Sequence, residues 1–170
     1  DFSFWKDFRD IAHSANKDTL LISEIFGDTS QWLQGDRFDG TMNYSFRESM
    51  TDYFATKRIN NKEFSDSLAY LYSMYSFEAL SSCQNLLSSH DVKRFLNRCG
   101  NDKNGMLGAI FMQATFPGIA GIYYGDEIGL GGADDPFNRE PFPWDDKNSW
   151  NLEILNYLKS IMEIKRTSSI

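Results

Sequence analysis

The sequence predicts an α/β fold in which short parallel strands alternate with helices. Three apolar runs, at residues 20–22, 86–87 and 119–124, are each followed by polar or acidic side chains. Uninterrupted apolar runs of this length are typical of strands buried on both faces of a parallel sheet. The chain has 170 residues, fewer than the ~250 of a complete (β/α)8 barrel, and its four expected strands are half of the eight, so it corresponds to about half of a TIM barrel.

The helical segments are recognised by apolar side chains at a spacing of three or four residues. The expected elements are, in chain order, a helix from residue 2 to about 16, a strand at 20–22 that leads to Glu24, a shorter strand at 38–44, helices at 46–57 and 61–75, a strand from residue 85, a helix at 102–114, a strand within 118–127, a loop at 129–143 and a helix at 152–166.

Composition excludes several classes of function. Hydrophobic residues make up 41% and charged residues 24% of the chain, which is typical of a globular domain. The net charge of −7 argues against a nucleic-acid partner, and no apolar run approaches the ~20 residues that span a bilayer. Cys83 and Cys99 lack the spacing of a zinc site or a disulfide framework, so we expect two unbonded thiols, no metal and no cofactor.

Glu24 ends one predicted strand, whereas His90 and Asp91 end another. The carboxyl ends of parallel strands meet at one edge of the sheet, where barrel enzymes carry out their chemistry. Two acids meeting there is the arrangement that glycoside hydrolysis requires, with one acid protonating the departing glycosidic oxygen. Two simpler interpretations remain open: in the first, Glu24 only turns to solvent, and in the second, Asp91 caps a helix that begins at Val92.

Three segments of the chain resemble, in this order, motifs of the α-amylase family of glycoside hydrolases. They are residues 21–26 (Leu-Ile-Ser-Glu-Ile-Phe), 85–94 (Asn-Leu-Leu-Ser-Ser-His-Asp-Val-Lys-Arg) and 121–129 (Gly-Ile-Tyr-Tyr-Gly-Asp-Glu-Ile-Gly). Residues 39–47 and the loop 131–139 are similar to the branch that contains neopullulanase, cyclomaltodextrinase and maltogenic amylase. The resemblance covers essentially the whole chain, so residues 1–170 are expected to be one partial catalytic domain, the C-terminal half of the barrel.

The resemblance implies a role for each matching residue. Glu24 matches the general acid/base, Asp91 the carboxylate that stabilises the transition state, and His90 the histidine beside it that binds sugar hydroxyls. Asp135 and Arg139 match the loop that contacts sugars further along the non-reducing side. Three aromatic residues are candidates for stacking on sugars, with plain packing as the alternative reading: Tyr44, Phe26 and Trp32.

The implied function is a retaining hydrolase of α-1,4-glucosidic bonds in cyclodextrins, pullulan or maltooligosaccharides. The alternatives are an α-1,6-glucosidase or transglycosylase of the same family, or a relative that only binds sugar or protein. The family's nucleophilic aspartate lies on the strand before Glu24, which this chain does not contain, so we expect a fragment that is inactive alone. Half a barrel should leave the three apolar runs on an open face and should self-associate or pair with the other half. The family also suggests a cytoplasmic location.

Overall fold

The computed structural model describes residues 1–168 and contains one parallel sheet. Its strands lie side by side in chain order, and they are β1 (Ile22–Ser23), β2 (Gly40–Asn43), β3 (Gln84–Leu86) and β4 (Ile119–Gly121). In the register, Ile22 lies opposite Gly40, Met42 opposite Gln84, and Gln84 also opposite Ile119. Strands in sequential order, with helices between them, are what a segment of a (β/α)8 barrel should show, and the predicted α/β class is confirmed.

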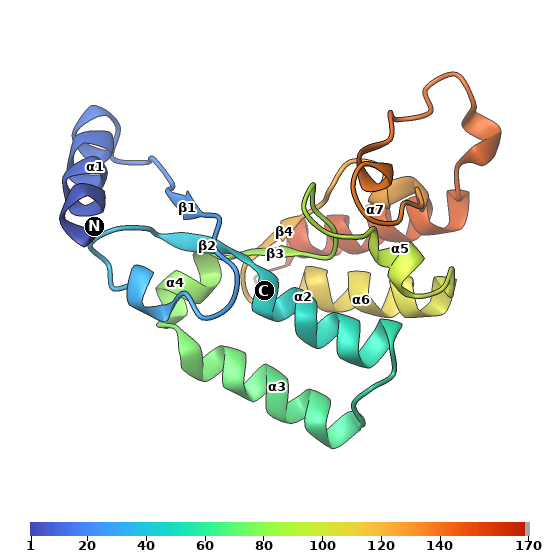
Figure 1. Cartoon of the computed structure of the whole chain (residues 1–170), viewed down its shortest axis with the longest axis horizontal. Coiled ribbons are helices and arrows are strands. Elements are labelled where there is room, and N and C mark those ends of the chain that lie inside the picture. The colour runs from blue at the N-terminus through green and yellow to red at the C-terminus, as the bar shows by residue number, and fades with distance from the viewer. Residues whose placement is uncertain (169–170) are drawn as a thin grey trace.

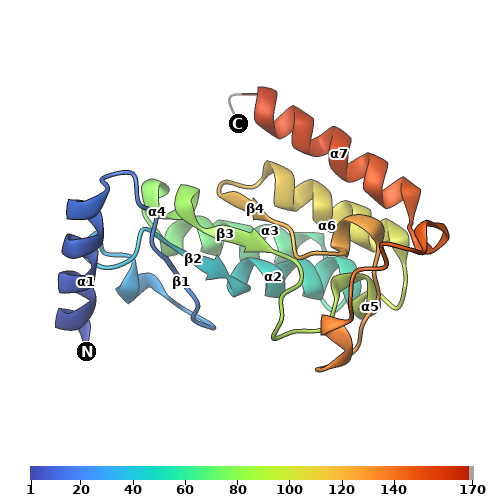
Figure 2. The ribbon, with the colours of Figure 1, turned by 90° about the horizontal axis from the view of Figure 1, so that it is seen from above.

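The helices connect the strands and cover the sheet (Figures 1 and 2). They are α1 (Phe2–Ala15), α2 (Tyr44–Met50), α3 (Asn61–Met74), α4 (Phe77–Ser82), α5 (Phe95–Arg98), α6 (Lys103–Thr115) and α7 (Leu152–Thr167). Figure 1 shows α1 standing at one end of the molecule, beyond β1. No residue of α1 is buried, whereas α7 packs on α6 through the buried side chains of Ile154, Leu158 and Ile161.

Side-chain caps explain where the longer helices begin. The Asn60 side chain accepts hydrogen bonds from the backbone N–H groups of Lys62 and Glu63, and the Glu63 carboxylate accepts one from the Asn60 N–H. This capping box fixes the start of α3. Asp102 caps α6 and Asn151 caps α7 in the simpler one-sided way.

The core lies between the sheet and helices α2, α3, α6 and α7, and its fully buried side chains include Phe46, Met50, Leu71, Phe95 and Ile110. Cys83 and Cys99 are buried and unbonded, as expected. Burial raises the pKa of the Cys83 thiol to about 11 and that of Cys99 to about 12, so both stay protonated at neutral pH.

The strands differ from the prediction in length and burial. Leu20, which lies just before the edge strand β1, is 48% exposed, and Ile119, the first residue of the edge strand β4, is 41% exposed. Leu86 and Leu87, which we expected on an open apolar face, are buried inside the chain instead, and Leu87 packs in the hydrophobic core. The open apolar face that we expected is therefore restricted to the two edge strands, β1 and β4.

The helices α4 and α5 were not predicted, and the expected helix at 46–57 continues from α2 as a π-helical turn over Thr51–Ala55. In the described part of the chain, none of the helices has the length and apolar character that crossing a membrane requires.

Candidate active site

Three polar side chains meet at the carboxyl-terminal edge of the sheet. Glu24 follows β1 directly, whereas His90 and Asp91 lie on the turn that follows β3. His90 Nε2 is 3.3 Å from Glu24 Oε1 and 3.4 Å from Asp91 Oδ1. The sequence predicted this convergence because each residue follows an apolar strand. All three side chains remain partly open to solvent, so a ligand can reach them.

The turn that carries His90 and Asp91 is built on two serine hydroxyls. Ser89 Oγ accepts the backbone N–H of Asp91 at 3.2 Å, and Ser88 Oγ accepts the N–H of Phe95 at 2.9 Å. Helix α5 begins only at Phe95, so Asp91 does not cap it. The capping interpretation of Asp91 is therefore wrong, and its carboxylate is left to face His90.

The rings of Phe26 and Tyr44 stack beside this cluster, with centroids 3.9 Å apart and planes inclined by 21°. The Tyr44 hydroxyl lies 3.0 Å from Ser89 Oγ. Burial raises the pKa of Tyr44, and the nearby charges of Glu24 and Asp91 add to that rise. Tyr44 is itself buried, whereas Phe26 is 56% exposed and offers the free ring face of the pair.

Trp32 has a different environment. Its ring packs against Phe2 at 4.7 Å and Phe38 at 6.2 Å, between α1 and the start of β2. It also lines a groove of about 580 Å³ that reaches Glu24. These contacts favour packing over sugar stacking for Trp32.

The loop that contains Asp135 and Arg139 reaches back to the same turn. Arg139 Nε donates to the backbone carbonyl of His90 at 2.9 Å and lies 3.2 Å from Asp135 Oδ1. Arg139 Nη2 is 3.7 Å from Asp91 Oδ1. The structure therefore brings Arg139 to the Asp91 carboxylate, while the Asp135 side chain extends into solvent.

A buried network supports the turn, and sequence reasoning missed it. Arg94 is completely buried, with Nε donating to the Asn138 carbonyl at 3.1 Å and Nη1 donating to the Tyr124 carbonyl. Its guanidinium lies 4.4 Å above the Tyr123 ring and 3.4 Å from Asp126 Oδ1. Burial raises the pKa of Asp126 to about 6, against the opposing effects of Ser88 and Arg94. The adjacent basic residues Lys93 and Arg94 suggest a surface, and nothing local in the sequence marks Arg94 as buried.

The atoms of Glu24, His90 and Asp91 that could bind a metal lie within 4.8 Å of one another. An imidazole nitrogen and two carboxylates are suitable ligands for a divalent cation. Exposed acidic groups commonly meet at this distance without an ion, so this spacing alone does not assign a metal site.

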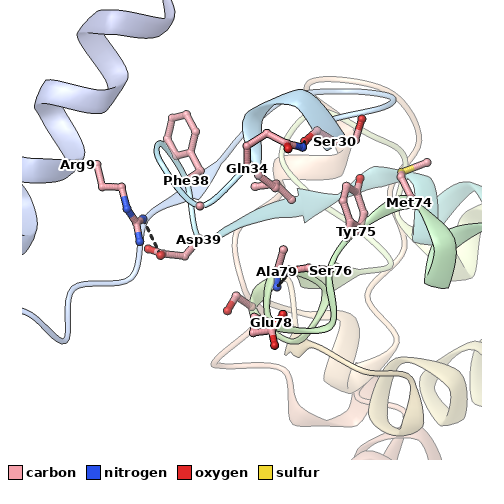
Figure 3. Close-up of a pocket in the computed structure, with 13 residues that line it drawn as sticks. Arg9, Ser30, Gln34, Phe38, Asp39, Met74, Tyr75, Ser76, Glu78 and Ala79 are labelled. Carbon is pink, nitrogen blue, oxygen red and sulfur yellow. Dashed lines mark hydrogen bonds and ion pairs between the residues drawn. The ribbon is translucent and has the colours of Figure 1, made fainter.

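A separate cavity of about 390 Å³ lies at the opposite edge of the sheet (Figure 3). Asp39 directly precedes β2 and Ser82 lies just before β3, which places this cavity at the amino-terminal side of the strands. Figure 3 shows Arg9 paired with Asp39 at its rim, where the two charged atoms are 2.6 Å apart. None of the residues that line this cavity belongs to the cluster of Glu24, His90 and Asp91.

The family described as "Alpha amylase, catalytic domain" matches residues 1–153. Over 165 residues the chain is 41% identical to neopullulanase 2 from Thermoactinomyces vulgaris, covering 97% of this chain and 28% of that protein. It is 35% identical over 166 residues to a cyclomaltodextrinase from Thermoanaerobacter pseudethanolicus, covering 98% and 29%. The chain thus spans less than a third of the length of these relatives.

Among solved structures, the chain resembles the cyclic α-maltosyl-(1→6)-maltose hydrolase from Arthrobacter globiformis in complex with its cyclic sugar. The TM-score is 0.96 at 30% identity, and the match covers 99% of this chain and 38% of that enzyme.

Proposed function

Because this chain belongs to the α-amylase family of glycoside hydrolases, we propose that it forms part of the catalytic domain of a retaining α-glucan hydrolase. The observation that carries the proposal is the convergence of Glu24, His90 and Asp91 at the edge of the sheet where such barrels react. The protein that contains the chain would cleave α-1,4-glucosidic bonds in cyclodextrins, pullulan or maltooligosaccharides, and would do so in the cytoplasm.

Glu24 is proposed as the general acid and base. Its carboxyl group would protonate the departing glycosidic oxygen, and the resulting carboxylate would then activate the water that opens the glycosyl-enzyme intermediate. His90 and Asp91 would bind hydroxyls of the sugar at the cleaved bond. Charge-assisted hydrogen bonds of this kind can strengthen as the sugar approaches an oxocarbenium-like transition state.

Retaining enzymes place a nucleophilic carboxylate about 5–5.5 Å from the acid. Carboxylate oxygens of Glu24 and Asp91 lie within 4.8 Å, so distance alone would allow Asp91 in this role. Asp91 Oδ1 is already close to Arg139 and His90, which favours a carboxylate that binds and stabilises. We place the nucleophile on a strand outside these residues, as the family resemblance implies.

The substrate proposal draws on the surroundings of the cluster. The exposed face of Phe26 offers a ring on which a sugar can stack, and Asp135 and Arg139 offer polar groups next to it. Relatives named neopullulanase and cyclomaltodextrinase support α-1,4-linked glucans. The likeness to a hydrolase of a cyclic sugar with (1→6) links supports the second candidate, an α-1,6-glucosidase or transglycosylase.

Replacing Glu24 by glutamine in the complete protein should test the assignment. Glu24→Gln removes the acidic proton and keeps the shape, so kcat on maltoheptaose should fall by ~10²–10⁴-fold, the usual contribution of a general acid or base. KM should change little, because the sugar-binding groups are retained. Steady-state kinetics and the thermal unfolding temperature would be measured for both proteins.

Glu78→Gln is the matched control, since Glu78 is an exposed acid that lines the cavity at the other edge of the sheet. Turnover close to that of the wild type in Glu24→Gln would remove Glu24 from the mechanism. A wild-type protein that binds maltooligosaccharides without cleaving them would favour the non-catalytic alternative.

A further inference from the structure

Asn138 holds the backbone of the turn that carries His90 and Asp91. Its side chain is buried, with 1% of the residue exposed. The amide nitrogen Nδ2 lies 2.8 Å from the carbonyl oxygen of His90, 3.1 Å from that of Val92 and 3.5 Å from that of Ser89. One side chain therefore meets three carbonyls of a single turn, from a loop that is more than forty residues away in the sequence.

The orientation of this amide follows from its surroundings. Turning the group over would place its oxygen against three carbonyl oxygens, which is repulsive, so the nitrogen must face the turn. In that orientation Oδ1 has no hydrogen-bond partner among the residues that the structure describes. A buried oxygen without a partner costs free energy, and the bonds made by the nitrogen offset that cost.

The backbone of Asn138 is fixed in turn by Arg94. Arg94 Nε donates to the Asn138 carbonyl at 3.1 Å, and the Arg94 N–H donates to the Gly132 carbonyl at 3.1 Å. The loop and the turn are thus tied together from both sides, with Asn138 as the contact nearest to His90. Arg139 adds a second donor to the His90 carbonyl from the solvent side.

We propose that Asn138 is a positioning residue, whose amide fixes the turn at residues 89–92 and thereby sets where His90 and Asp91 meet the sugar. The inference rests on the proposed function, because it assigns a role in that reaction. Asn138 does not reach the sugar itself. A displacement of catalytic groups by about 1 Å can lower a rate by ~10²-fold, so loss of these hydrogen bonds should act on turnover.

The test compares two buried amides in the complete protein. Asn138→Asp replaces the donating nitrogen by an oxygen that faces three carbonyls. Gln113→Glu makes the same chemical change at a buried amide of α6, which donates to the Asn85 carbonyl in β3 and the Gly121 carbonyl in β4 and does not contact the turn. Asn138→Leu removes the donors without adding an acid. Steady-state kinetics on maltoheptaose would be run well below the lowest unfolding temperature of the set.

We expect both Asn138 variants to lower kcat by ~10–100-fold with KM within about threefold of the wild type. Gln113→Glu should lower the unfolding temperature about as much as Asn138→Asp does, but it should leave kcat within about twofold of the wild type. Equal kcat values in the Asn138 and Gln113 variants would reduce Asn138 to a structural residue and overturn the proposal. If the wild-type protein hydrolyses no α-glucan, the proposed function itself fails, which is a different result.

A measurement on the wild-type protein covers the case in which the variants do not fold. The side-chain NH2 protons of Asn138 should exchange with solvent at least as slowly as those of Gln113, followed by NMR after transfer to D2O. Fast exchange at Asn138 would show that the amide is not bound to the turn, and would overturn the proposal without any assay of activity.

Discussion

At the residue scale, the candidate site combines accessible acids with a buried support. Glu24, His90 and Asp91 are open to solvent, whereas Arg94 and Asp126 behind them are buried and paired. Buried ion pairs of this kind add little net stability, but removing one partner is costly because it strands the other charge. The buried pair is therefore better understood as a fixed support for the turn than as a source of stability.

The raised pKa of Asp126 predicts a definite dependence of stability on pH. Its pKa is about 6 in the folded chain, above the ordinary value of 3.8, so between these values the folded state binds more protons than the unfolded state. The stability that Asp126 contributes therefore falls as the pH rises from about 4 to 6. The difference in unfolding free energy, wild type minus Asp126→Asn, should decrease over this range by at most about 3 kcal/mol, at ~1.4 kcal/mol per pKa unit.

Urea unfolding at several pH values would measure this difference. Asp145→Asn is the control, because Asp145 is exposed, and its difference from the wild type should not fall in the same way. A difference for Asp126→Asn that stays constant or increases between pH 4 and 6 would contradict the raised pKa.

At the element scale, the helices with strong local signals were predictable. The expected helix at 61–75 is α3 (Asn61–Met74), since Asn60 and Glu63 form a capping box and apolar residues follow at helical spacing. The strands were found, but β1, β2 and β4 are shorter than the segments expected for them, because only two to four residues of each pair with a neighbour. β3 begins at Gln84, one residue before its expected start. The six-residue α4 and four-residue α5 are too short for periodicity to reveal.

The residues of the candidate site likewise divide into those with a local sequence signal and those without one. The positions of Glu24, His90 and Asp91 could be predicted because residues that follow strands of one parallel sheet share one edge. The burial of Arg94 and Asn138 could not, since it depends on contacts between segments far apart in the sequence. Trp32 could not be assigned either, because an aromatic residue that packs and one that stacks on sugar have the same local sequence.

Close packing between β2 and the end of α4 makes a second prediction. A Cβ atom on Gly40 would lie 2.1 Å from the Ser82 carbonyl oxygen, and 2.9 Å from the Cys83 nitrogen, so rigid backbone would have to move. We expect Gly40→Ala to cost about 1–3 kcal/mol, the usual range for overpacking. Gly131→Ala is the matched control, because nothing lies within 4 Å of its Cβ position.

Thermal unfolding of both glycine variants would measure the effect. A Gly40→Ala chain as stable as Gly131→Ala would mean that β2 and α4 are not in the close contact that the structure shows.

At the scale of the whole molecule, the open sheet predicts association. Both edge strands have an unpaired side, and α1 exposes Phe4, Phe8 and Ile11 next to the apolar groove that reaches Glu24. Exposed edges pair with other chains, and covering apolar surface contributes ~25 cal/mol per Å². We expect the isolated chain to self-associate at micromolar concentration, or to pair with a segment that completes the barrel. Light scattering over a dilution series would detect this, and a stable monomer would contradict it.

The isolated chain should also be inactive. In the proposed mechanism Glu24 protonates the leaving group and His90 and Asp91 bind the sugar, but we place the nucleophile outside these residues. Assays of the purified chain on maltoheptaose should show no turnover, and adding a segment that completes the barrel should restore it. Measurable turnover by the chain alone would instead assign the nucleophile within it, with Asp91 as the first candidate by distance.

The strand order has a consequence for how the chain is made. Each strand pairs with the strand that precedes it in the sequence, so no pairing has to wait for a segment synthesised much later. As the chain leaves the ribosome, β2 can dock on β1 while β4 is still untranslated, and each new strand and helix can extend the existing edge. The unpaired edge of β4, one of the two edges that invite association, is thus the edge that forms last during synthesis.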